Sequence, residues 1–184
     1  MTATAAEGRC EECGFDYEAL DPSEAPAAIR GFAKRYRAPL TRFLPGEDGD
    51  TLLRQRPAAG TWSALEYAAH VRDVFDSYDR WIGRILDHER PVLEGPKPDD
   101  LAVERRYNDD DPAAVADALA ANAERLAATV EAVPDDGWDR VGLRRDEERS
   151  VRLHARRAVH EGSHHLLDIG RGMRAVRDRR KAAT

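Results

Sequence analysis

The chain has 184 residues, of which 41% are hydrophobic and 35% charged, and its net charge is −6 at pH 7. We expect one domain with a single core over residues 1–184. The negative charge argues against a nucleic-acid partner, and no apolar run is long enough to cross a membrane. The opening residues lack the basic and apolar regions of a secretory signal, so we expect a cytoplasmic protein.

Apolar residues recur at helical spacing in four stretches, and no stretch alternates as a strand does. The first predicted helix begins after Ser23 and ends before Pro45, with a kink or interruption at Pro39. The second begins at residue 63, where Ser63 and Glu66 have the spacing of a capping box. It continues to about residue 88.

The other two predicted helices also have clear start signals. Asp111 precedes Pro112, an acidic N-cap followed by proline at the first helical position, and this third helix ends before Pro134. Ser150 can cap the fourth, which runs to about Met173. The basic tail at 175–184 is predicted to be flexible. Four long helices predict an all-α four-helix bundle with long inter-helix loops.

Three of the six histidines crowd into residues 160–165. His160 and His164 are one helical turn apart, so both imidazoles can face one metal ion. His165 lies about 140° round the helix from His160 and cannot join that pair. His70, on the second predicted helix, can point between helices and supply a third ligand. The alternative for these histidines is a hydrogen-bonded or surface role.

The same segment spells His-Glu-x-x-His, the zinc-protease signature, with Glu161 in the general-base position. Such proteases take their third ligand downstream, and no His or Glu follows His165. Three imidazoles with an open position suit a catalytic Zn²⁺, Ni²⁺ or Fe²⁺. Glu161 remains a candidate base for metal-assisted hydrolysis.

Cys10 and Cys13 are the only cysteines, and they exclude a disulfide framework. Their Cys-x-x-Cys spacing matches half of a zinc knuckle, and a tetrahedral site would have to borrow ligands such as His88 or His154. A redox or inert role for the two thiols is the alternative, although redox pairs normally occur in a βαβ setting.

Two segments, GTWSALEYAAHVRDV at 60–74 and VHEGSHHLLDI at 159–169, resemble the signature regions of the DinB-like superfamily. The N-terminal CEECGFDY resembles the opening of an actinobacterial, CxxC-containing branch. The superfamily includes mycothiol-dependent maleylpyruvate isomerases and bacillithiol transferases. The resemblance implies a four-helix-bundle metalloenzyme whose divalent metal, Zn²⁺ first among the candidates, is held by His70, His160 and His164.

From this resemblance we expect a thiol-dependent transferase or isomerase that acts on a small molecule with a low-molecular-weight thiol. Two alternatives stay open: a metal-dependent hydrolase with Glu161 as base, and a non-catalytic metal-binding stress-response protein. Family habit adds the expectation of a homodimer. Asp73 lies opposite the apolar stripe on the helical wheel, where it is expected to serve solubility.

Overall fold

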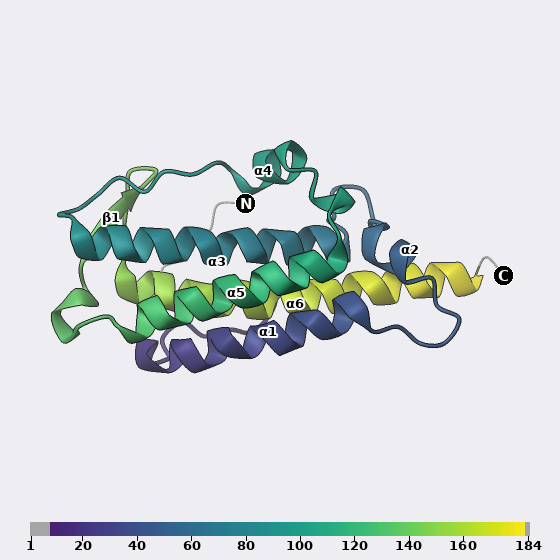
Figure 1. Cartoon of the computed structure of the whole chain (residues 1–184), viewed down its shortest axis with the longest axis horizontal. Coiled ribbons are helices and arrows are strands. Elements are labelled where there is room, and N and C mark those ends of the chain that lie inside the picture. The colour runs from purple at the N-terminus through teal and green to yellow at the C-terminus, as the bar shows by residue number, and fades with distance from the viewer. Residues whose placement is uncertain (1–7, 183–184) are drawn as a thin grey trace.

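The computed structural model describes residues 8–182 and shows four long helices packed as a bundle (Figure 1). They are α1 (Ala25–Thr41), α3 (Ala64–Asp87), α5 (Pro112–Glu131) and α6 (Val151–Ala182). Helices α3 and α5 run in one direction, and α1 and α6 run in the other. Both α1 and α3 pack mainly against α5 and α6, so α1 and α3 lie across the bundle from each other. The predicted all-α four-helix bundle is confirmed.

Short elements precede α1 and occupy the connections between the long helices. They are α2 (Gly49–Arg54), α4 (Pro98–Glu104), the 3₁₀ turns Pro22–Glu24, Tyr107–Asp109 and Asp135–Gly137, and the strands β1 (Val141–Arg144) and β2 (Glu147–Ser150). The long loops therefore contain regular secondary structure and lie against the bundle.

The predicted start of α3 is confirmed in detail. The Ser63 hydroxyl accepts from the Glu66 backbone N–H at 3.2 Å, and the Glu66 carboxylate accepts from the Ser63 N–H at 2.8 Å. The rings of Trp62 and Tyr67 pack 5.5 Å apart at the same end, as a hydrophobic staple should. This cap fixes the first turns of α3, which carry His70.

The expectation that the chain lacks strands is wrong at residues 141–150. β1 and β2 form an antiparallel hairpin in which Val141 pairs with Ser150. Its two-residue turn, Arg145 and Asp146, has φ angles of 52° and 66°, the left-handed geometry of a tight hairpin. These residue types adopt that geometry less readily than Asn-Gly, so the usual sequence signal of the turn is absent.

Helix α6 extends beyond its predicted end near Met173 and continues to Ala182. The Arg177 side chain donates from Nε to the Glu47 carboxylate at 2.6 Å, which attaches this part of α6 to the loop before α2. Residues 183 and 184 lie outside the described part of the chain. Pro39 is accommodated within α1, which ends two residues later at Thr41.

Helices α1 and α6 are in tight contact at Gly162. A Cβ atom there would lie 2.5 Å from Cε2 of the buried Phe32 ring, which is too close for any side chain. The Tyr36 hydroxyl donates to the Gly162 carbonyl at 2.9 Å across the same contact. This contact fixes the position of the α6 turn that carries the histidine-rich segment.

His154 lies fully buried in the core near the start of α6 and contacts the rings of Tyr78 and Trp81. In residues 8–182 neither ring nitrogen has a hydrogen-bond partner. Burial is the main cause that lowers the pKa of His154 to about 3, and the positive charges of three arginines add to it, Arg149, Arg157 and Arg144. The folded protein therefore holds this imidazole neutral.

This burial predicts a specific loss of stability in acid. The folded-state pKa lies below the unfolded value of about 6.5, so the stabilisation is complete above that pH and declines as pH falls towards about 3. The expected slope is about 1.4 kcal/mol per pH unit for this single group. Urea unfolding of the wild type and His154→Leu, compared across pH, measures it; curves with the same pH dependence would contradict the prediction.

Candidate metal centres

The histidine-rich segment of α6 faces two different neighbours. Among residues 8–182, potential ligand atoms lie within 4.8 Å of one another in three groups: Cys10, Cys13, His160 and His164; His70, Glu161 and His165; and His164, His165 and Asp168. The third group shares its histidines with the first two. The segment therefore presents one set of ligands to the N-terminal segment and another to α3.

The group against α3 combines two imidazoles with one carboxylate. Glu161 Oε2 lies 3.5 Å from His70 Nε2 and 3.2 Å from His165 Nε2. Ligands bonded at 2.0–2.1 Å in a tetrahedral site are separated by about 3.4 Å, so these spacings fit a divalent cation. His70 is only 7% exposed, whereas the Glu161 side chain is 24% exposed. The group is therefore anchored in the bundle and open on one side.

Neighbouring side chains orient both imidazoles. His165 Nδ1 lies 3.0 Å from Asp168 Oδ2, a contact that favours the proton on Nδ1 and leaves Nε2 facing Glu161. The Tyr67 ring stacks on His165 at 5.1 Å, and the Trp62 ring packs against His70 at 5.2 Å. The start of α3 thus holds the ligand from its own helix and the ligand from α6.

The charges in this group compensate each other when no cation is present. Burial opposes the charged form of His165, but hydrogen bonds to Asp168 and Glu161 outweigh it and raise the pKa of His165 to about 9. Burial likewise opposes ionisation of Glu161, yet the hydrogen bonds from His165 and His70 hold its pKa well below the usual value. The carboxylate is therefore ionised, and a cation would compete with the His165 proton.

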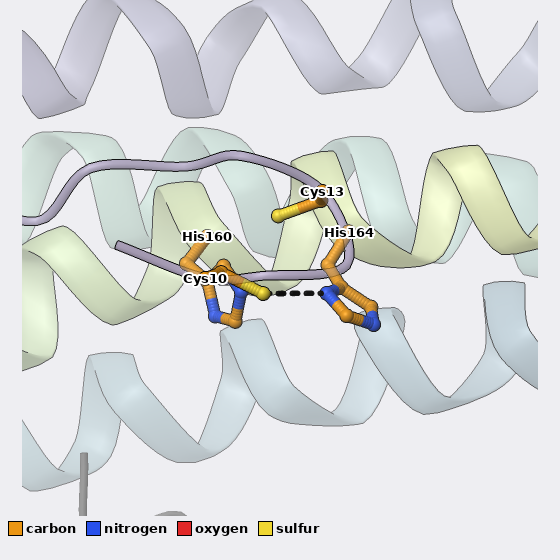
Figure 2. Close-up of side chains that lie close together, drawn as sticks. All are labelled: Cys10, Cys13, His160 and His164. Carbon is orange, nitrogen blue, oxygen red and sulfur yellow. Dashed lines mark hydrogen bonds between the residues drawn. The ribbon is translucent and has the colours of Figure 1, made fainter. Parts of the chain in front are cut away.

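The other group joins α6 to the N-terminal segment, residues 8–20, as Figure 2 shows. Cys10 Sγ lies 3.6 Å from His164 Nδ1. His160 Nδ1 lies 2.7 Å from the Tyr17 hydroxyl, and burial lowers the pKa of His160, so its imidazole is neutral. Two thiols and two imidazoles are a common ligand set for zinc.

The structure divides the predicted triad between the two groups. His160 and His164 face the cysteines, and His165 and Glu161, in place of them, accompany His70. The sequence contained a signal for this grouping, because Glu161 and His165 are also one helical turn apart. Metal binding by His70, His160, His164, Cys10 and Cys13 stays a prediction. His88 and His154, considered as partners for the cysteines, belong to none of the three groups.

The expected solubility role of Asp73 is wrong, because its side chain is buried in a polar network. It is 8% exposed and accepts from Arg72 at 2.8 Å, from Arg105 at 2.9 Å and from the Tyr107 hydroxyl at 2.6 Å. Arg72 also donates to Asp110 at 2.7 Å. The wheel position of Asp73 faces the long connection before α5, which covers this side of α3.

Fold and site together describe a four-helix bundle in which candidate His and carboxylate ligands project from facing helices and two cysteines approach from the N-terminal segment. Residues 34–169, well over half of the chain, match the DinB superfamily, and the chain belongs to that superfamily. The match includes His70 and the histidine-rich segment of α6, and it begins after Cys13.

A solved structure is similar over most of its length: YfiT from Bacillus subtilis, described as a probable metal-dependent hydrolase with an unusual four-helix bundle topology. The TM-score is 0.76 at 15% sequence identity, over 85% of this chain and 90% of that one. No curated protein matches the sequence. Within residues 8–182, none of the helices combines the length and apolar character needed to span a membrane.

Proposed function

We propose that this protein is a divalent-metal-dependent enzyme acting on a small molecule, with His70, Glu161 and His165 as the ligands of the catalytic cation. The observation that carries the proposal is the spacing of 3.2–3.5 Å between the Glu161 carboxylate and both imidazoles. Three protein ligands leave coordination positions open, as catalytic sites do. Membership of the DinB superfamily and the likeness to YfiT agree with it.

A cation held there would supply an activated nucleophile, because it lowers the pKa of a bound water or stabilises a thiolate. The protein's own residues position that chemistry. Asp168 holds the His165 ring in the required orientation, and Trp62 and Tyr67 wall the site beside the partly exposed Glu161. The Glu161 carboxylate has the spacing from both imidazoles that is expected of a metal ligand. In this proposal it therefore binds the cation and does not act as a general base.

Thiol-dependent transfer is the first candidate reaction and rests on the resemblance of the two histidine segments. Hydrolysis is the second, and the description of YfiT as a probable metal-dependent hydrolase favours it. The nucleophile is a thiolate in the first reaction and water in the second. Zn²⁺, Ni²⁺ and Fe²⁺ are the candidate metals, since imidazole and carboxylate ligands accept all three.

The test loads the full chain separately with Zn²⁺, Ni²⁺ and Fe²⁺ and assays each form with two substrate panels. One panel pairs mycothiol, bacillithiol or glutathione with aromatic and maleyl electrophiles, and the other contains activated esters and amides. Metal-dependent thiol consumption supports transfer, and metal-dependent hydrolysis without it supports the second candidate. Absence of metal-dependent turnover in both panels would overturn the proposal and leave a metal-binding protein without catalysis.

A further inference from the structure

We propose that Cys10, Cys13, His160 and His164 form a closed zinc site that fastens the N-terminal segment to α6. The four ligand atoms lie within 4.8 Å of one another, and none of these residues belongs to the His70 group. This site is therefore additional to the catalytic centre proposed above and is independent of whether that centre turns over substrate.

The sulfur and nitrogen spacing fits zinc. Cys10 Sγ and His164 Nδ1 are 3.6 Å apart. Tetrahedral Zn²⁺, with bonds of about 2.3 Å to sulfur and about 2.0–2.1 Å to nitrogen, places such a pair about 3.6 Å apart. Figure 2 shows both sulfurs on the same side of α6 as the two imidazoles.

One ring nitrogen of His160 is buried without a partner in the described part of the chain, which points to a missing ligand at this site. Its Nε2 atom is shielded from solvent and, within residues 8–182, has no hydrogen-bond partner. Its other nitrogen, Nδ1, is 2.7 Å from the Tyr17 hydroxyl and can donate to that oxygen. An imidazole with one nitrogen held by an oxygen and the other left unpartnered next to thiols is prepared to bind a metal.

His164 is oriented in the complementary way. Its Nδ1 faces Cys10, and its Nε2 lies 3.2 Å from a carboxylate oxygen of Glu12, which sits between the two cysteines in sequence. A carboxylate that accepts from the second nitrogen fixes the tautomer and strengthens the metal ligand. Both histidines therefore have partners for their non-ligating nitrogens in the same N-terminal segment.

The backbone around the cysteines forms a compact turn. The Cys10 N–H donates to the Phe15 carbonyl at 2.7 Å, and the Gly14 N–H donates to the Cys10 carbonyl at 2.8 Å. Gly14 has a φ of 75°, a conformation that glycine adopts without strain. The turn brings the two cysteines close together, with their sulfurs within 4.8 Å of each other and of the ligand atoms of His160 and His164.

The ligand chemistry selects the metal and the role. Two thiolates balance the charge of a divalent ion, and sulfur ligands favour Zn²⁺ over Mg²⁺ or Ca²⁺. Four protein ligands leave no position for substrate, so the site is structural. The superfamily match covers residues 34–169, so the cysteines lie outside the matched residues and this site would connect them to helix α6 within the match.

The first test uses Co²⁺ in place of Zn²⁺ in the full chain. We expect thiolate-to-cobalt charge-transfer absorption and the intense visible bands of a tetrahedral ion. The charge-transfer absorption should be lost in the Cys10→Ser, Cys13→Ser double variant and retained in His70→Ala, which alters only the other group. Absence of charge-transfer absorption in cobalt-loaded wild type, or its loss in His70→Ala, would overturn the proposal.

A second measurement needs no variant and remains informative if the double variant fails to fold. Zinc-loaded wild type is treated with a thiol-specific disulfide reagent before and after a chelator removes the metal. We expect both thiols to be protected in the loaded protein and to become reactive after chelation, with release of zinc. Equal reactivity in the two states would contradict the site.

Discussion

His70→Ala is expected to remove the cation from the group formed by His70, Glu161 and His165, with a loss of affinity greater than about 100-fold. His70 is the ligand of this group that comes from α3, and it is only 7% exposed. A side chain at the surface therefore cannot reach its position to bind the cation unless the core rearranges. Metal-dependent turnover should fall with the cation. Metal titration of the chelator-treated protein, followed by assay, measures both effects.

The control for that experiment is His88→Ala, which removes an exposed histidine at the end of the same helix. It should bind the cation as the wild type does. If His70→Ala and His88→Ala bound metal with equal affinity while both remained helical, the proposed catalytic centre would be wrong.

Glu161→Gln separates two roles for the carboxylate while keeping the size of the side chain. A ligand role predicts that this variant loses both the cation and activity, because the amide carries no charge to balance the metal. A general-base role, the alternative inferred from the His-Glu-x-x-His pattern, predicts normal metal affinity and a reduced rate. Equilibrium titration next to kinetics on the same sample distinguishes the two.

Asp73→Ala is expected to have the largest effect on stability, about 3–5 kcal/mol of unfolding free energy. The Asp73 carboxylate is buried and accepts from three donors. Burial alone would raise the pKa of Asp73, but these hydrogen bonds outweigh burial and lower it. Removing it leaves the half-buried Arg72 guanidinium with one carboxylate partner, Asp110, and leaves the buried Tyr107 hydroxyl without its acceptor. Urea unfolding at neutral pH, with chelator present throughout, measures the change.

Asp76→Ala is the matched control on the same helix. Asp76 pairs with Arg80 and Arg125 at the surface, where its side chain is 41% exposed, and such pairs contribute about 0.2–1 kcal/mol. An Asp73→Ala effect no larger than the Asp76→Ala effect would show that the buried network does not stabilise the fold.

The starts of the long helices could be predicted because their signals are local. The capping box at Ser63 and the acidic N-cap at Asp111 each bond to a backbone N–H only three residues away, so sequence spacing contains the whole interaction. Ser150 likewise accepts from the Leu153 N–H at the start of α6. The β1–β2 hairpin lacked such a signal, since its turn residues are charged.

The grouping of the metal ligands could not be predicted, because it depends on which neighbour covers each side of α6. The helical angle between His160 and His165 correctly indicates that they face different directions. It does not state that the N-terminal segment covers one direction and α3 the other. The burial of Asp73 has the same origin, since a distant connection brings Arg105 and Tyr107 over a face of α3 that would otherwise be exposed.

Anomalous diffraction at the absorption edge of the bound metal, from crystals of the metal-loaded full chain, tests the central claim most directly. We predict one peak bonded to His70, Glu161 and His165 and a second bonded to Cys10, Cys13, His160 and His164. A single peak bonded to His70, His160 and His164, or no peak beside His70, would contradict the account.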